Sequence, residues 1–177
     1  MTPTEELLSG TWLYRLPRFE DLRGSFVKTY LRSALASHGV QFDLAEEFYS
    51  SSHKDVIRGM HFQLPPHDHV KLVYCPVGAV LDVLLDLRAG PGYGKVASAE
   101  LSERNPGMVL IPRGVAHGFR SLSDGSVMVY KTSTEHAPAH DSGVRWDSFG
   151  FDWQCASPIL SDRDTQHPAL SSFESPF

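Results

Sequence analysis

Short apolar runs separated by turn residues recur along most of the chain. Runs of strand length occur at residues 11–16, 45–52, 56–63, 70–76, 79–87, 95–101, 108–111, 115–122 and 127–134. Segments rich in Gly and Pro separate them, as at residues 89–92 and 105–107. Many short strands at this spacing are typical of an all-β sandwich or jelly-roll barrel. The pattern therefore predicts an all-β fold with a few short helices, in a single domain over residues 1–177.

Few segments depart from the strand pattern. Residues 21–24 have the composition of a turn, and residues 25–30 are predicted to form the strand that follows it. Residues 33–38 are predicted to form the one helix before the C-terminal region, with Ser33 as its N-cap. From residue 136 onward the periodicity is weak, so we expect packed coil with short helical turns there.

Composition narrows the class of protein. The chain has 177 residues, enough for one domain with a substantial core, and 41% of them are hydrophobic. Its net charge of −5 argues against a nucleic-acid partner. No apolar run is long enough to span a membrane, and the first residues lack the regions of a signal peptide. Two cysteines, Cys75 and Cys155, are too few for a disulfide framework, so we predict a cytoplasmic protein.

The run from Val56 to Gln63 holds the first candidate functional residues. Arg58 and His61 lie an odd number of positions apart, so a flat strand would point them to opposite faces. Gly59 between them predicts a bulge, which would bring both side chains toward one cavity. An arginine suits a phosphate, and a histidine suits proton transfer near neutral pH. Taken alone, the two residues fit equally well as a solvent-facing arginine and a hydrogen-bonded core histidine.

A partial cupin motif raises the question of a metal. Residues 112–117, Pro-Arg-Gly-Val-Ala-His, fit the second cupin motif, PxGxxH. The first motif would need HxH followed shortly by Glu, and His67 and His69 form the only close HxH pair. Val73 and Tyr74 stand where the Glu would fall. Three histidines from different strands could still hold zinc or iron, but we expect no metal and a solvated loop at His67 and His69.

A set of short motifs carries a family resemblance. In chain order they are Asp21-x-Arg23-Gly24, Arg58-Gly59-x-His61-x-Gln63, Lys71-Leu72-Val73, Asp82-Val83-x-x-Asp86-Leu87-Arg88, Leu101-Ser102, Ile111-Pro112, Ala116-His117-Gly118-Phe119, Tyr130-Lys131 and Leu160-Ser161-x-x-Asp164. Each motif alone is weak, but the ordered set resembles the dTDP-4-dehydrorhamnose 3,5-epimerase family of sugar-nucleotide epimerases over roughly residues 11–168. The resemblance implies a cupin homodimer that acts on a nucleotide-diphospho-4-keto-6-deoxyhexose without metal or cofactor.

The resemblance also implies roles for residues at matching positions. His61 looks like the catalytic base, Asp164 like its partner, and Tyr130 like the opposing acid. The implied substrate-pocket residues are Lys71, His117, Gln63, Phe26 and Lys28. Arg58 and Arg23 look like ligands of the diphosphate, with Arg23 reaching across from the other subunit.

The chemistry of epimerisation suits these residue types. A ketone at C4 acidifies the protons on C3 and C5, and two proton carriers must then flank the sugar. A neutral His61 can accept a proton if Asp164 holds its other nitrogen, and the Tyr130 phenol can donate from the far face. The charge of Lys71 can stabilise the enolate oxygen.

Each of these residues alone also has a structural explanation. Tyr130 fits a buried tyrosine, Asp164 a helix-capping acid, Lys71 a strand-edge charge, and His117 a hydrogen-bonded core histidine. The ordered set favours the functional roles.

Two other functions stay open at this point. A cupin 3,4-ketoisomerase would share the sugar-nucleotide pocket but would need a different arrangement of proton carriers. A non-catalytic sugar-nucleotide-binding cupin would have no use for His61, Tyr130, Lys71 and Asp164 together. The residue set therefore favours the epimerase.

The chain departs from the family pattern at several positions. Lys28 stands where the family has a Glu that faces thymine, and lysine can only donate hydrogen bonds. We therefore predict a preference for a CDP- or GDP-linked sugar over the dTDP-linked one, although a solvent-facing Lys28 would leave dTDP as the default. Glu46 and Phe48 replace a Gln-x-Asn pair, and His136 replaces an aromatic residue.

Overall fold

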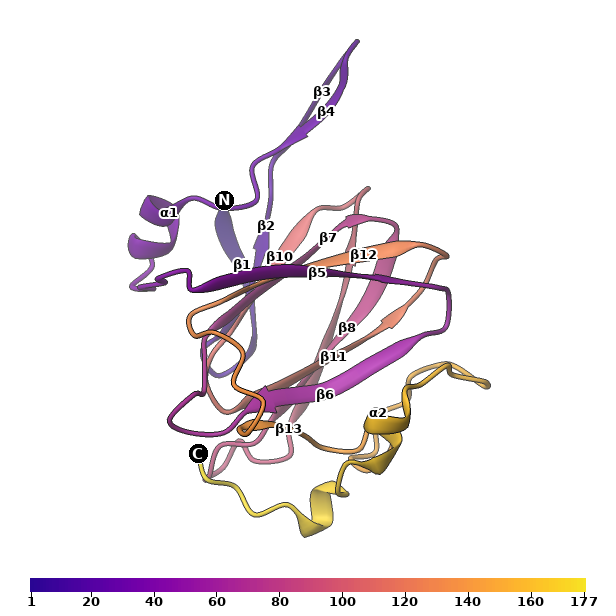
Figure 1. Ribbon diagram of the computed structural model, residues 1–177. Helices are drawn as coiled ribbons and strands as arrows, with labels where there is room; N and C mark the ends of the chain where they lie inside the picture. Colours follow the sequence, from indigo (N-terminus) through magenta and orange to yellow (C-terminus); the bar gives the residue numbers. More distant parts are fainter.

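Two antiparallel sheets packed face to face form the body of the computed structural model, which describes residues 1–177 (Figure 1). The six-stranded sheet has the order β1 (Thr2–Leu8), β2 (Thr11–Arg15), β10 (Gly107–Ile111), β7 (Lys71–Val77), β12 (Ser126–Thr132), β5 (Glu46–Ser52). The five-stranded sheet has the order β13 (Asp141–Gly143), β6 (Ile57–Gln63), β11 (Val115–Ser121), β8 (Ala79–Asp86), β9 (Val96–Ser102). The all-β, cupin-like jelly-roll prediction is confirmed, but the sheets do not close into a continuous barrel.

The remaining elements lie toward the two ends of the sequence. β3 (Arg18–Asp21) and β4 (Gly24–Val27) form a hairpin that projects away from both sheets (Figure 1). The hairpin exposes the large apolar side chains of Phe19, Leu22 and Phe26. The helical segments are α1 (Arg32–Ala36), α2 (Asp162–Gln166) and the 3-10 turn η1 (Leu170–Ser172). None of these helices has the length and apolar character needed to cross a membrane.

The core fills the space between the sheets and also covers the outer face of each. Between the sheets, Leu13 and Val73 of one sheet belong to the same cluster as Leu84 and Phe119 of the other. The outer face of the five-stranded sheet packs against the C-terminal region, and that of the six-stranded sheet against the region around α1. Strand β8 is therefore buried on both faces, which explains its nearly continuous apolar run.

A β-bulge in β6 decides where the candidate side chains point. His61 pairs with His117 and Arg58 pairs with Phe119, so two residues of β6 stand opposite one residue of β11. The extra residue lets Arg58 and His61 both line the space between the sheets, despite their odd separation. Gly59 has a φ of 142°, and a Cβ there would lie 2.5 Å from the backbone of β11, so glycine permits this close approach. The predicted bulge is confirmed.

Sequence periodicity missed three strands and misplaced one helix start. β1 is mostly exposed and forms by pairing with β2 at the sheet edge. β3 pairs with β4 outside the two large sheets, and β13 has only three residues. α1 begins at Arg32 with Leu31 as its N-cap, so the assignment of Ser33 is wrong, and the strand predicted over residues 25–30 ends at Val27. These elements depend on backbone pairing rather than on burial, so a hydrophobic period does not reveal them.

Candidate active site

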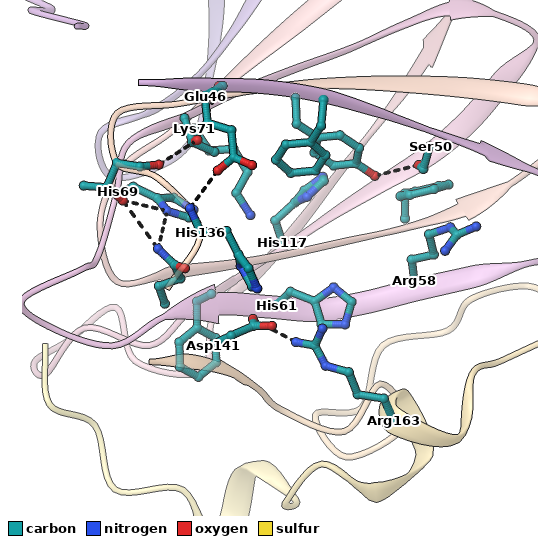
Figure 2. A pocket seen from close by; sticks show the side chains of 17 residues that line it. Glu46, Ser50, Arg58, His61, His69, Lys71, His117, His136, Asp141 and Arg163 are labelled. Atoms are coloured by element: carbon teal, nitrogen blue, oxygen red, sulfur yellow. Dashed lines mark hydrogen bonds and ion pairs between the residues drawn. The ribbon is translucent and has the colours of Figure 1, made fainter. Parts of the chain in front are cut away.

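A cavity of about 270 Å³ opens between the two sheets. Its lining comes from β5, β7 and β12 of one sheet and from β6 and β11 of the other. In Figure 2, Arg58 and His61 extend into it from one side and Glu46 and Ser50 from the other. Further along the same strands, the inward-facing side chains are apolar and form the core. The sequence-predicted residues that line this cavity are His61, Tyr130, Lys71, Arg58, Gln63 and His117.

A buried carboxylate holds His61. Its Nε2 lies 2.6 Å from Oδ1 of Asp164, and 29% of its side chain is exposed, against 4% for Asp164. Because a carboxylate only accepts, Nε2 donates to it and Nδ1 keeps the free lone pair. Burial raises the pKa of Asp164, but hydrogen bonds with His61 and Ser161 and the charge of His61 outweigh it, so the pKa lies below its ordinary value. His61 is therefore oriented as a proton acceptor.

Helix α2 brings Asp164 to His61. Ser161 is the N-cap of this helix, and its Oγ accepts a hydrogen bond from the backbone N–H of Asp164 at 3.1 Å. The explanation of Asp164 as the capping acid is therefore wrong, since Ser161 performs that role and leaves the carboxylate available to His61.

Tyr130 stands on the other wall of the cavity, next to β5. Its ring stacks on that of Phe48, with centroids 4.8 Å apart and planes 14° from parallel. Its hydroxyl lies 3.2 Å from Oγ of Ser50. Burial raises the pKa of Tyr130, so the phenol is protonated at neutral pH and available as a donor.

Lys71 enters the cavity from the start of β7, which lies inside the six-stranded sheet. Its side chain is buried, so its explanation as a strand-edge charge is wrong. Burial lowers the pKa of Lys71 to about 8, and the charges of Asp141 and Asp82 oppose that change. The ammonium group is therefore mostly charged at neutral pH and close to losing its proton in mild alkali.

His117 forms a second histidine–carboxylate pair. Its Nε2 lies 2.6 Å from Oδ1 of Asp82, with 4% of the His117 side chain and none of the Asp82 side chain exposed. Burial lowers the pKa of His117, although the adjacent Asp82 opposes the effect. The expectation of a hydrogen-bonded core histidine therefore describes its surroundings correctly, and the residue also lines the cavity.

Arg58 and Gln63 are held by neighbouring groups in the cavity wall. Nε of Arg58 donates to Oγ of Ser52 at 3.1 Å, which places the guanidinium beside β5. The amide of Gln63 donates to the carbonyl of His67 at 2.8 Å and accepts from the N–H of Ala137 at 2.6 Å. Gln63 thus ties two loops together, and it shapes the wall more than it offers free polar groups.

The expectation of a solvated loop at His67 and His69 is wrong. Both residues are half-buried, because the loop folds back over the cavity wall. Nδ1 of His69 lies 3.2 Å from Nε2 of Gln63 and 3.3 Å from Oγ1 of Thr134, and burial lowers the pKa of His69 to about 3. The ring of His67 packs on that of His140 with centroids 4.4 Å apart. These histidines therefore contact protein groups, although Nε2 of His69 is buried without a hydrogen-bond partner, and the absence of a metal stays a prediction.

Four of the sequence-predicted residues do not line the cavity: Asp164, which contacts His61, and Arg23, Phe26 and Lys28, which lie away from it. Arg23 and Phe26 are on the β3–β4 hairpin, where Arg23 forms an exposed salt bridge with Asp21 at 2.6 Å. Lys28 follows β4 and is also exposed. Arg23 and Phe26 thus share the hairpin, and none of the three residues lines the cavity that contains His61.

Several cavity residues were not predicted as site residues, although Glu46, Phe48 and His136 stand at positions where the chain departs from the family pattern. Glu46, Phe48 and Ser50 alternate along β5 and line the wall beside Tyr130. Their period of two, combined with the register of β5 on β12, could have identified them as one inward-facing row. The other unpredicted lining residues are Phe62, His69, Phe119, Thr132, Thr134, His136, Asp141 and Arg163. Asp82 was identified only as part of a motif, with no sign of its partner His117.

The comparisons with known proteins agree with this geometry. Residues 5–172 match the family model of dTDP-4-dehydrorhamnose 3,5-epimerase. The enzyme of that name from Sinorhizobium fredii is 37% identical over 163 residues, which cover 89% of this chain and 84% of the relative.

Solved structures share the fold along nearly the whole chain. The dTDP-4-dehydrorhamnose 3,5-epimerase of Bacillus anthracis, solved with TDP and PPi bound, has a TM-score of 0.91 at 34% identity, covering 95% of this chain and 98% of that one. A 3'-monoepimerase from Streptomyces bikiniensis, solved with dTDP-quinovose, has a TM-score of 0.88 at 29% identity, covering 97% and 88%. The chain therefore belongs to the dTDP-4-dehydrorhamnose 3,5-epimerase family and is an isomerase, a carbohydrate epimerase.

Proposed function

We propose that this protein epimerises C3 and C5 of a nucleotide-diphospho-4-keto-6-deoxyhexose by removing a proton from one face and returning one to the other. The observation that carries the proposal is that His61 and Tyr130 occupy facing walls of one cavity. Relatives solved with TDP and PPi and with dTDP-quinovose support a nucleotide-sugar substrate. The whole chain acts as one domain in deoxysugar biosynthesis.

His61 is the base in this proposal. Its Nε2–H is held by Asp164, so its Nδ1 accepts the acidic proton next to the C4 ketone. The imidazolium that forms is stabilised by the adjacent carboxylate, which stays ionised.

Tyr130 is the acid on the opposite face. The phenol donates its proton to the enolate carbon, and the charge of Lys71 stabilises the enolate oxygen while it exists. His117 contributes a fixed, buried hydrogen-bonding group to the wall that carries His61, since Asp82 holds its ring. All the proton carriers are protein side chains, so the reaction needs no cofactor and no metal.

The diphosphate binds at the guanidinium of Arg58 and at Arg23 of a second copy of the chain. A planar guanidinium matches phosphate oxygens through two parallel hydrogen bonds. Arg23 lies too far out on its own hairpin to line its own cavity, and the exposed apolar residues of that hairpin favour a homodimer in which it covers the neighbour.

Mixed dimers test this sharing of residues. Arg23→Ala and His61→Ala chains are combined after each is shown to be inactive alone. If Arg23 acts across the interface, the mixed dimer contains one complete site and regains activity. If it acts within its own chain, every site in the mixture stays defective.

The reaction itself is tested by incubating a panel of nucleotide-linked 4-keto sugars in deuterated water and locating the deuterium by NMR. Deuterium at both C3 and C5 with inverted configuration is the expected result. Incorporation at C3 alone identifies a monoepimerase, the activity named for the Streptomyces bikiniensis relative. A keto group moved to C3 identifies a 3,4-ketoisomerase, and binding without exchange identifies a non-catalytic protein.

A further inference from the structure

His167 lies beside the proposed base, and the reaction described above does not use it. It is the C-cap that follows α2, and its ring centroid lies 5.7 Å from that of His61, with the planes 70° apart. Its Nε2 is 3.8 Å from the same Oδ1 of Asp164 that accepts the hydrogen bond from His61. Two imidazoles therefore flank one carboxylate oxygen.

The fold builds a specific place for this ring. Gly143 of β13 pairs with His61, and a Cβ at Gly143 would lie 2.5 Å from Nε2 of His167. The backbone N–H of Arg145 donates to the carbonyl of Pro168 at 2.8 Å, which fixes the chain just after the histidine. The ring thus fills a space that exists because position 143 has no side chain.

The unpaired nitrogen of His167 faces this carboxylate. Its Nε2 is buried and has no hydrogen-bond partner, and 12% of the side chain is exposed. Burial lowers the pKa of His167, as do the charges of His61 on β6 and Arg163 on α2, while Asp164 and Asp141 oppose them. His167 is therefore neutral near pH 7, and an Nε2–H would point its dipole toward Asp164.

We infer that His167 is a positioning residue that keeps His61 unprotonated to lower pH by sharing the charge of Asp164. The inference rests on the proposed role of His61 as the base. An N–H dipole near the carboxylate takes up part of its negative charge, so less of that charge remains to stabilise a protonated His61. One carboxylate also balances only one positive charge, so a charge on His61 disfavours a charge on His167.

Two substitutions separate this effect from packing. His167→Leu keeps the apolar volume against Gly143 and removes the donor, whereas His167→Gln keeps an N–H donor. The His61 ring signal is titrated by NMR without substrate, and the pH profile of kcat/KM is measured in parallel. We expect His167→Leu to move the His61 midpoint and the acidic limb of the profile up by about half a pH unit, and His167→Gln to stay near the wild type.

Equal midpoints in the wild type and His167→Leu, or equal shifts in the two variants, would show that His167 only packs. If His167→Leu does not fold, ¹⁵N shifts of wild-type His167 decide instead, since an unprotonated Nε2 at pH 7 overturns the inference and a protonated one supports it. The NMR titration needs no turnover, so its failure is distinguishable from a failure of the proposed epimerisation.

Discussion

The two histidine–carboxylate pairs of the cavity have the same geometry and opposite surroundings. Both join Nε2 to a carboxylate oxygen at 2.6 Å. The His61 side chain is 29% exposed toward the cavity, whereas that of His117 is 4% exposed. A proton can reach and leave the first pair, but the second is sealed from solvent. The hydrogen bond alone therefore does not make a base, because access to the substrate also decides the role.

Replacing His61 should have the largest effect on activity, because it removes the accessible histidine of the two pairs. His61→Ala should lower solvent exchange at every reacting carbon by about 10³-fold or more, because the neighbouring His117 is almost fully buried and held by Asp82. The measurement is deuterium incorporation into the 4-keto sugar, with circular dichroism to show that the fold persists. Near-normal turnover by a folded variant would contradict the assignment.

Tyr130 lies on the sheet opposite both pairs, and its ring centroid lies 6.0 Å from that of His117. Tyr130→Phe removes only the hydroxyl, and we expect epimer formation to fall by about 10²-fold. Exchange should fall less, because His61 can return a proton to the face it came from. Full epimerisation by this variant would show that water or another residue is the acid.

Substituting Asp164 or Asp82 tests directly whether the two pairs have different roles. Asp164→Asn should lower kcat by tens of fold, because His61 loses the charge that stabilises its protonated form. Asp82→Asn should change kcat by less than about tenfold but lower the free energy of unfolding by about 3 kcal/mol, because it breaks a fully buried pair. Kinetics and urea unfolding of both variants measure the contrast, and equal effects on kcat would remove it.

Alkaline pH should affect the reaction through Lys71, which faces both pairs from the six-stranded sheet. Its pKa of about 8 means that the ammonium charge is present below this pH and is lost as pH rises through it. We expect kcat to fall about twofold by pH 8 and about tenfold by pH 9, as the enolate loses its stabilising charge. Lys71→Met should be slow at every pH and lack this limb; a limb unchanged in the variant would assign it to another group.

Lys28 belongs to neither pair, so substituting it should have the smallest effect on kcat/KM. Wild-type kcat/KM should favour the CDP- or GDP-linked sugar over the dTDP-linked one by several-fold, and Lys28→Glu should move the preference toward dTDP. The same 4-keto sugar on each nucleotide gives the comparison. A wild-type preference for dTDP that the substitution leaves unchanged would place Lys28 in solvent.

The fold class could be predicted from the sequence because a strand that is buried on both faces has a nearly continuous run of apolar residues. Strand β8 and its neighbours carry long apolar runs, and the glycine in β6 marked the bulge. β1 and β3 have no such apolar runs, because β1 pairs at a sheet edge and β3 pairs within a hairpin. These elements are stabilised by backbone pairing, which requires no periodic pattern of apolar residues in the sequence.

The site was predictable where single residues carry chemistry and unpredictable where contacts join distant segments. The motifs identified His61 and Asp164, which are 103 positions apart, only because a family pattern connects them. Phe48 and Asp82 have ordinary residue types, and their roles beside Tyr130 and His117 depend on strand register. The burial of His69 likewise follows from a loop closing on Gln63, which composition does not encode.

The bulge in β6 decides to which face each later side chain of that strand points. Side chains alternate between faces along a strand, so one inserted residue exchanges inside and outside for the rest of that strand. If the same residues formed a regular strand without the bulge, His61 would turn toward the outer cluster and Met60 would enter the cavity. The bulge thus keeps Arg58 and His61 on one face, and losing it without losing a residue would reverse which residues of β6 the cavity contains while the composition stayed the same.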